Sequence, residues 1–285
     1  MWFLAFRYLL NRKKQSLLIL IGIVLGTTAY VSIAGMMLGF QQYILEQLVE
    51  NEAHIRIQAR EDIIEETSEI NTYILECPKE FTWEAGAHTH FALEGFNIVE
   101  KPNRSLVRHM SISTLPEEEV IGITTRVKEE CSEFKSILRS EGIGKKVALF
   151  KTSTNMPLKR EHRPIYLLSS GVGIATFRPL LLDYLKDDSG VASIHSLNVD
   201  STGDFLFGDI FQSDKAKGIS VESVTSRKAY YDALSLLALD KTAFFYIVGS
   251  DEFLTENISV LQKAGIWNER IVLDKHDFQL EKFLK

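Results

Sequence analysis

The chain has 285 residues, a formal net charge of -6 and two cysteines, Cys77 and Cys131. This length allows two modest domains with full hydrophobic cores. The acidic balance, with no basic block after the N-terminus, predicts no binding of nucleic acid. Two cysteines exclude a disulfide framework, a structural zinc site and a cluster held by four thiolates. Any redox chemistry therefore needs a cofactor without cysteine ligands.

Leu17 to Leu38 form a run of 22 residues without a charge. As a helix this run is about 33 Å long, at roughly 1.5 Å per residue, enough to cross a bilayer core of about 30 Å. We therefore expect a single uncleaved membrane helix. Charges flank it asymmetrically, with Arg7, Arg12, Lys13 and Lys14 before it and Glu46, Glu50 and Glu52 after it. The positive-inside rule then places the N-terminus in the cytoplasm and the rest of the chain outside.

The N-terminal sequence resembles a known transporter family over about the first 64 residues. The stretch LAFRYLLNRKKQSLLILIGIVLGTTAYVSIAGMMLGFQQYILEQLVENEAHIRIQAREDII is similar to the amino-terminal end of an ABC transporter permease of the lipoprotein-release and macrolide-export type. The resemblance implies a membrane anchor over residues 1–52. No other uncharged run of spanning length exists in the sequence, so the later helices of such a permease are missing.

Residues 53–158 are predicted to form a first soluble domain. Apolar and polar residues alternate in short runs bounded by glycine, proline or charged clusters, which favours a small antiparallel β-barrel. His88 and His90 fall on one face of a predicted strand. They form a candidate metal pair, although no third ligand lies nearby in sequence, and histidines on the barrel rim are the alternative.

Residues 159–285 are predicted to form a second domain built on alternating strands and helices, which is typical of a parallel sheet covered by helices. The stretch from Arg163 to Asp183 gives a strand, the turn Gly171-Val172-Gly173 and a helix. Glycines allow a ligand close to the backbone, and the positive end of the helix favours a pyrophosphate. Because Thr176 replaces the third glycine of the common motif, a tight turn without a ligand is the alternative.

Arg108, Met110 and Ser111 resemble the flavin signature of the ferredoxin-NADP reductase superfamily. The resemblance implies that Arg108 binds the pyrophosphate of FAD and that Ser111, as a catalytic residue, bonds to the isoalloxazine edge. Met110 stands where members stack an aromatic ring on the flavin. Farther on, Ser132 begins a predicted helix, and in the family a serine and helix N-terminus at this place also hold the flavin pyrophosphate.

The same resemblance continues through the second domain. Gly171 to Arg178 are similar to the family's nicotinamide-nucleotide loop, with Thr176 in place of a proline. Phe245 to Phe253 resemble its strand and capping-helix motif, with Val248 in place of a cysteine. The implied nucleotide-binding residues are Gly171, Gly173, Thr176, Gly249 and Ser250. Ser226 and Arg227 resemble the site of the 2′-phosphate of NADP, with a solvated helix start as the alternative.

The sequence therefore predicts an antiparallel β-barrel FAD domain followed by an α/β NAD(P)-binding domain. We expect a reductase that passes a hydride from NADH or NADPH to FAD, and electrons to a separate acceptor such as a ferredoxin- or flavodoxin-like protein. The alternative is a non-enzymatic, membrane-tethered component associated with an ABC transporter permease. The charge bias around the anchor conflicts with the cytoplasmic location of reduced nicotinamide cofactors. Three explanations of that conflict are open: insertion of the anchor against the rule, an unusual compartment for the enzyme, or a join of two genes near residue 64 by fusion or faulty assembly. The join would also explain why the two parts of the chain resemble different families.

Overall fold

The computed structural model describes residues 14, 17–18, 21–33, 35–37, 56–97, 103–203, 205–208, 210, 218–275 and 277–284. The chain divides into two compact units, Met1–His54 and Ile55–Lys285. In the first unit, residues 21–33 and 35–37 are helical. Among the residues described, no helix combines the length and the apolar character needed to cross a membrane. The predicted span from Leu17 to Leu38 lies partly outside these residues.

The first half of the larger unit is a six-stranded sheet in the order β4-β3-β6-β1-β2-β5, with antiparallel pairing throughout. Just after the end of β4, the Ser113 N–H donates to the carbonyl of Gly122 within β5 at 2.8 Å, which brings the two edges of the sheet together. The predicted antiparallel barrel is thereby confirmed. Its strands are β1 (Arg56–Glu65), β2 (Ile70–Glu76), β3 (Ala87–Leu93), β4 (Val107–Ser111), β5 (Val120–Arg126) and β6 (Lys146–Thr154).

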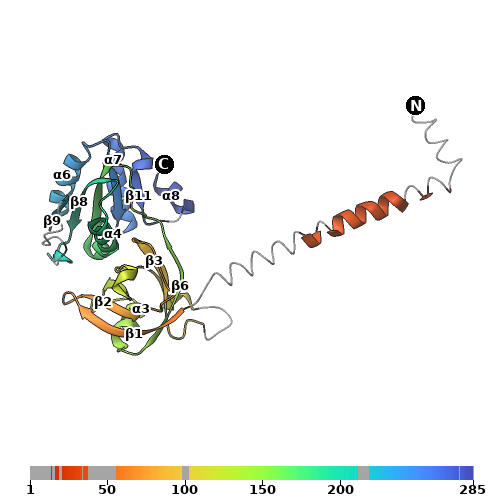
Figure 1. Cartoon of the computed structure of the whole chain (residues 1–285), viewed down its shortest axis with the longest axis horizontal. Helices are drawn as coiled ribbons and strands as arrows, with labels where there is room; N and C mark the ends of the chain where they lie inside the picture. The colour runs from red at the N-terminus through yellow and green to blue at the C-terminus, as the bar shows by residue number, and fades with distance from the viewer. Residues whose placement is uncertain are drawn as a thin grey trace. The chain divides into compact units, whose positions relative to one another are not determined.

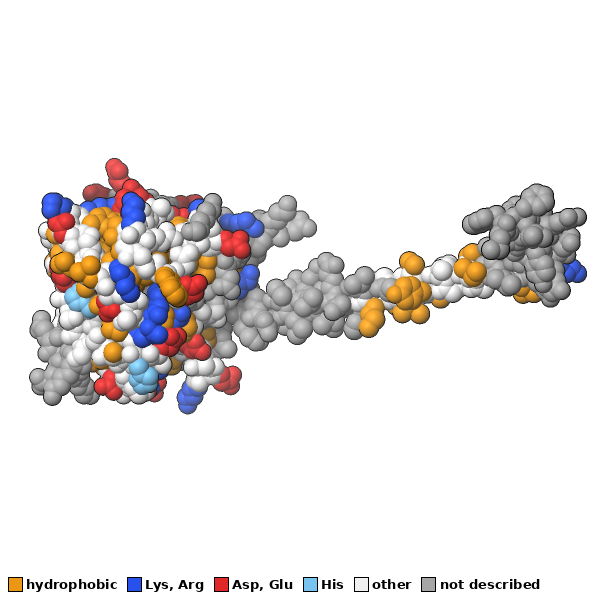
Figure 2. All heavy atoms as spheres, turned by 90° about the horizontal axis from the view of Figure 1, so that it is seen from above, with side chains coloured by type: hydrophobic (Ala, Val, Ile, Leu, Met, Phe, Trp, Pro, Cys, Tyr) orange, Lys and Arg blue, Asp and Glu red, His pale blue; other side chains and the backbone are white. Residues whose placement is uncertain are grey.

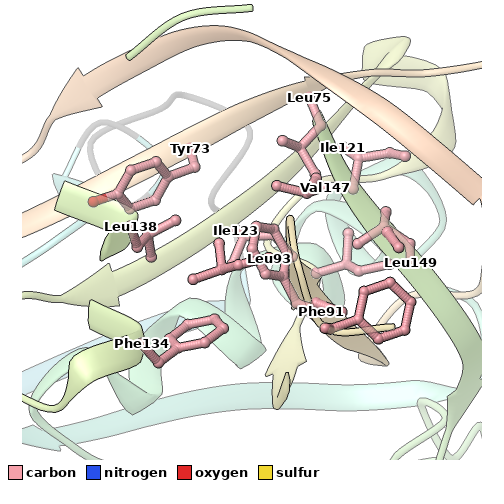
Figure 3. Packing of buried hydrophobic residues seen from close by; sticks show 14 of the residues in the cluster. Tyr73, Leu75, Phe91, Leu93, Ile121, Ile123, Phe134, Leu138, Val147 and Leu149 are labelled. Atoms are coloured by element: carbon pink, nitrogen blue, oxygen red, sulfur yellow. The ribbon is translucent and has the colours of Figure 1, made fainter. Parts of the chain in front are cut away.

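The helix α3 (Glu133–Ser140) packs against the core of this lobe. Its apolar residues lie four positions apart and share one helix face, so Phe134 and Leu138 are both fully buried. Figure 3 shows these two side chains directed at strand residues such as Phe91 and Ile123. Because both its first turn and its C-terminal half are anchored in the core, the helix has a fixed position in this lobe.

The predicted parallel sheet is confirmed in the second half of the larger unit, where five strands lie in the order β11-β10-β7-β8-β9. Figure 1 shows the antiparallel sheet with α3 in one lobe and the parallel sheet with its helices in the other. The elements are β7 (Arg163–Ser170), α4 (Ile174–Lys186), β8 (Val191–Val199), β9 (Ile219–Val224), α6 (Arg227–Leu237), β10 (Phe244–Val248), α7 (Asp251–Lys263), β11 (Ile271–Leu273) and α8 (Asp277–Phe283).

Both faces of the parallel sheet are covered, which explains why its strands read as nearly continuous apolar runs. Phe177 and Leu181 of α4 pack on one face, together with Ile165 of β7. Residues of α6 and α7, including Tyr230 and Ile258, pack on the other face. Because all five strands are parallel, the loops that follow them lie at the same edge of the sheet.

The strand order reverses at β7, whose neighbours are β8 on one side and β10 on the other. From β7 the chain passes through α4 to β8 and then to β9, and it returns to β10 on the opposite side of β7. In open parallel sheets, ligands bind beyond the carboxyl ends of the strands at such a reversal. The loops after β7 and β10 are therefore the first place to look for a site.

Candidate functional site

The turn after β7 meets the end of β10 at close range. Gly171 has a φ of +56°, a left-handed conformation that favours glycine. A Cβ atom on Gly173 would lie 3.1 Å from the Val248 carbonyl oxygen and 3.3 Å from its Cγ1. Backbone conformation at Gly171 and close packing at Gly173 therefore favour glycine whether or not a ligand binds. The loops after β7 and β10 are in contact.

The first turn of α4 reaches the strand that carries the predicted flavin motif. Thr176 is buried, and its Oγ1 donates a hydrogen bond of 2.9 Å to Ser111 Oγ at the end of β4. Met110, the preceding residue, is half-buried and packs against the barrel core. The structure thus brings together Ser111 and Thr176, which the sequence analysis assigned to two different cofactors.

A second contact fixes α4 against the first lobe. The Arg178 guanidinium makes two hydrogen bonds of 2.8 Å to the two carboxylate oxygens of Glu118 and a third, also 2.8 Å, to the Ser113 carbonyl. Lys186, at the end of α4, forms an ion pair with Glu117. A forked arginine–carboxylate contact of this kind sets orientation as well as distance. The N-terminus of α4 is consequently held beside β4.

The predicted residues of the flavin pyrophosphate site also come together. Nη1 of Arg108 donates to the Ser105 and Val107 carbonyls, at 3.0 and 2.7 Å, and the guanidinium lies 5.2 Å from the centre of the Phe134 ring. Phe134 belongs to the first turn of α3, which Ser132 precedes as the N-cap residue. Arg108 and the N-terminus of α3 are therefore neighbours, and the binding of a flavin pyrophosphate between them stays a prediction.

Further positive charge surrounds this helix N-terminus. Lys135, in the first turn of α3, donates to the Arg126 carbonyl at 2.6 Å. The pKa of Lys135 lies below its usual value, first because burial disfavours the charged form and then because of the nearby cations Arg108, Arg126 and Lys128. Cations gathered at a helix N-terminus are suited to a polyanionic group such as a pyrophosphate.

Four other predicted cofactor-binding residues have structural tasks in this fold. Ser226 and Ser250 are the N-caps of α6 and α7, and their hydroxyls accept hydrogen bonds from the Ala229 and Phe253 amides, both at 3.2 Å. A Cβ on Gly249 would lie 2.5 Å from the Phe253 ring. Arg227 forms an ion pair of 2.7 Å with Glu256. Their roles in nucleotide binding stay predictions, because capping, packing and an ion pair explain these four residues without a ligand.

One pair of residues at the site was not singled out by the sequence analysis. Arg126, at the end of β5, donates through Nη2 to Oδ2 of Asp200 at 2.6 Å. Asp200 directly follows β8, at the carboxyl edge of the parallel sheet. A carboxylate directly after a predicted parallel strand was the available signal. The pairing with Arg126 was not available, because it joins residues 74 positions apart.

The two histidines proposed as a metal pair lie on β3. The His88 ring is 4.0 Å from that of His109, and its Nδ1 lies 3.5 Å from Oδ1 of Asp274, which follows β11. The ring of His90 stacks on Phe150 at 5.2 Å. Within the described residues, no group of three histidine, cysteine, aspartate or glutamate side chains is placed to hold a metal ion. The contact of His88 with Asp274 instead links the two lobes.

The charged surface of the Ile55–Lys285 unit is mixed. Figure 2 shows lysine and arginine side chains interspersed with acidic ones on the visible face of this unit, with apolar groups between them. The basic side chains on this face do not form one continuous area.

Comparison with known proteins gives a likeness of structure. No family model matches the sequence, and no curated protein matches it. The chain is similar to a ferredoxin NADP+ reductase from Neisseria gonorrhoeae with bound FAD and NADP, at 12% identity and a TM-score of 0.64, covering 78% of this chain and 98% of that one. It is similar to a ferredoxin-NADP+ reductase from Plasmodium falciparum, at 14% identity and a TM-score of 0.63, covering 78% and 96%.

A third similar structure contains the CS-b5R domains of human Ncb5or in its NAD+ form, at 16% identity and a TM-score of 0.63, covering 78% of this chain and 70% of that one. At these identities the likeness concerns the fold. It agrees with the order of elements found here, an antiparallel barrel followed by a five-stranded parallel sheet. The larger unit of this chain has the two-lobed fold of the ferredoxin-NADP reductases.

Proposed function

We propose that this chain is an FAD-dependent oxidoreductase that takes a hydride from NADH or NADPH and passes electrons to a separate acceptor. The observation that carries the proposal is the hydrogen bond between Ser111 and Thr176. It joins the strand of the flavin motif to the helix that follows the dinucleotide turn. Two cofactors bound at these places would lie next to each other, as hydride transfer requires.

The residues at the N-terminus of α3 suit the pyrophosphate of FAD. Arg108 and Lys135 supply positive charge there, and the helix supplies backbone amides. Ser132 makes no capping hydrogen bond within the described residues, so its hydroxyl is available to a ligand. Bound FAD would supply the electron-carrying chemistry, while Ser111 would orient the flavin edge.

The nicotinamide nucleotide is assigned to the turn after β7. The N-terminus of α4 and the reversal of strand order at β7 both favour a pyrophosphate at this place. Val248, at the end of β10, adjoins the turn and gives the nicotinamide ring an apolar neighbour. A valine cannot form a hydrogen bond, so we assign it a packing role only.

The acceptor is proposed to be a separate electron-transfer protein, such as a ferredoxin- or flavodoxin-like one, or a soluble oxidant. The test uses the purified full-length chain in detergent, incubated with FAD and freed of excess cofactor. NADH and NADPH are then each supplied with ferricyanide as an artificial acceptor. We expect ferricyanide reduction that depends on added FAD. No reduction by either nucleotide from a chain that retains FAD would overturn the reductase proposal.

We further propose that residues 17–38 anchor the protein in a membrane as a single pass. The support is the sequence itself, an uncharged run of sufficient length. The permease resemblance of residues 1–64 is likewise a proposal from sequence, as is a join of two genes. Sequencing across the codons for Ile64 to Ser68 tests the join. Alkaline extraction of membranes that contain the full chain tests the anchor, and release into the supernatant would contradict it.

A further inference from the structure

Arg60 of β1 is buried at the C-terminal end of α3. Its side chain is fully buried, and its Nη1 donates to the Leu138 carbonyl at 3.3 Å and to the Glu141 carbonyl. The last carbonyls of a helix have no partner within the helix and carry its partial negative charge, so a cation stabilises them. Arg60 therefore holds the end of α3 opposite to the one assigned to the flavin pyrophosphate.

The main chain of Arg60 contacts the segment that leaves α3. Its N–H donates to the Lys145 carbonyl at 3.0 Å, and its carbonyl accepts from the Gly144 amide at 2.8 Å. Gly144 has a φ of +83°, which favours glycine in this turn. One residue of β1 thus binds both the end of α3 and the turn that leads from it to β6. The C-terminal end of the helix is thereby tied to the barrel.

The stability of the barrel does not by itself explain a guanidinium at this place. Burial lowers the pKa of Arg60, although Tyr73 and Glu141 act in the opposite direction. Within the part of the chain that the structure describes, the buried Nε and Nη2 of Arg60 have no hydrogen-bond partner, and Nη2 lies 4.0 Å from Oε2 of Glu141. A buried cation with unused donors is costly, and an apolar side chain of similar size is often as stable or more so.

Arg60 and the apolar side chains of α3 fix different aspects of its position. Phe134 and Leu138 determine which face of the helix is buried, but apolar contacts are not directional. Hydrogen bonds to carbonyls are directional and also fix the helix along its axis. The helix has 8 residues and is about 12 Å long at roughly 1.5 Å per residue. A displacement of its C-terminal end would therefore also displace the amides of its first turn.

We propose that Arg60 is a positioning residue for FAD. By holding the C-terminal end of α3, it keeps the first-turn amides and Lys135 directed at the flavin pyrophosphate. Arg60 lies at the opposite end of the helix and acts on the cofactor only through α3. The inference rests on the proposed function, because it assumes that FAD binds with its pyrophosphate at the N-terminus of α3.

The test compares Arg60→Met with the wild type, both as the purified full-length chain in detergent. Quenching of FAD fluorescence gives the affinity, and phosphorus NMR of bound FAD reports the surroundings of the pyrophosphate. We expect Arg60→Met to weaken FAD binding roughly tenfold, as the loss of one hydrogen bond would, and to shift the phosphorus resonances. Arg60→Lys keeps the charge without the planar fork of donors, so its loss of affinity should be intermediate. Wild-type affinity and an unshifted spectrum in Arg60→Met would overturn the inference.

A double-variant cycle separates positioning from a general loss of stability. Lys135→Met should weaken FAD binding by a smaller factor on the Arg60→Met background than in the wild type, because the displaced helix no longer directs Lys135 at the pyrophosphate. Equal factors on the two backgrounds would overturn the inference. The matched control is Arg139→Met, which removes a cation that donates to the Lys128 carbonyl at 3.2 Å and should leave the affinity and the spectrum unchanged.

Thermal unfolding of each chain identifies a variant that does not fold. Should Arg60→Met be such a variant, Arg60→Lys carries the test in the same cycle, and wild-type affinity with an unshifted spectrum would again overturn the inference. Failure of the wild type to bind FAD would instead overturn the proposed function.

Discussion

Thr176 donates a hydrogen bond to Ser111 from the first turn of α4, the helix that follows the Gly171–Gly173 turn. The two hydroxyls connect the barrel to the parallel sheet at the point where that sheet reverses its strand order. Thr176 stands where the family resemblance expects a proline, which has no hydroxyl to donate. The substitution therefore adds a contact between the lobes, and it does not disrupt the helix.

Ser111 and Thr176 can be separated by a pair of variants. Ser111→Ala removes the hydrogen bond and the hydroxyl assigned to the flavin edge, whereas Thr176→Val removes the bond between the lobes and leaves the Ser111 hydroxyl in place. We expect Ser111→Ala to slow FAD reduction by NADH roughly tenfold or more, as expected for one hydrogen bond, and Thr176→Val to slow it by a smaller factor. Stopped-flow measurement of flavin reduction gives both rates. Identical rates in the two variants would show that Ser111 acts only through its contact with Thr176.

The cations at α3 predict a position-dependent effect on FAD affinity. Lys135→Met removes a charge from the first turn of α3, and Arg139→Met removes one from the last turn of the same helix. We expect the first change to weaken FAD binding about tenfold, because it lies at the helix end assigned to the pyrophosphate. The second should have little effect. Quenching of FAD fluorescence measures both constants, and equal weakening would place the pyrophosphate elsewhere.

Much of the fold was predictable from the sequence because local patterns determine it. The apolar runs from Ile165 to Leu168 and from Phe244 to Val248 lie in strands buried on both faces, and the positions of Phe134 and Leu138 identify α3. Arg60 was not predictable. Its buried guanidinium lies 4.9 Å from the Tyr73 ring and donates to carbonyls at the end of α3, about 80 residues away. A sequence pattern does not reveal which distant carbonyls need a donor.

Some residues of the candidate site were also predictable from the sequence, and others were not. Arg108 and Ser132 were matched to one pyrophosphate, and the structure places them close together. The sequence did not distinguish binding from capping at Ser226 and Ser250, because a serine before a helix serves either purpose. Asp200 was missed for a related reason, since its importance comes from a partner in the other lobe.

Gly249 tests whether a glycine is kept for packing or for a ligand. A Cβ at this position would lie 2.5 Å from Phe253 Cδ1, so Gly249→Ala should destabilise the fold by roughly 1–3 kcal/mol, as overpacking does. Phe253→Leu removes ring atoms, so the loss of stability caused by Gly249→Ala should be smaller in the double variant than in the wild-type background. Urea denaturation of the wild type, the two single variants and the double variant measures the coupling. Additive losses would contradict the packing explanation.

The contact between His88 and Asp274 predicts a pH dependence of stability. Burial alone would raise the pKa of Asp274, but the hydrogen bond and charge of His88, with smaller contributions from His109 and Asn155, lower it below 3.8. A carboxyl group whose pKa is lower in the folded state than in the unfolded state stabilises the folded protein at pH values above the unfolded-state pKa. This stabilisation is lost as the pH falls through the folded-state pKa. The free energy of unfolding should therefore decrease on acidification below about pH 3.8.

Asp274→Asn should make that decrease less steep, because the amide does not titrate. The control is Asp188→Asn, at an exposed position in the turn before β8. Urea denaturation over a series of acidic pH values measures the slope for each chain. The same slope in Asp274→Asn and the wild type would show that the contact with His88 does not contribute to stability.

The central claim is that the two lobes hold FAD and a nicotinamide nucleotide side by side. It is tested most directly by the visible absorption spectrum of the purified full-length chain after incubation with FAD, gel filtration and anaerobic addition of NADH or NADPH. The account predicts a retained flavin spectrum that is bleached by at least one of the two nucleotides. A chain that elutes colourless after incubation with FAD would contradict it.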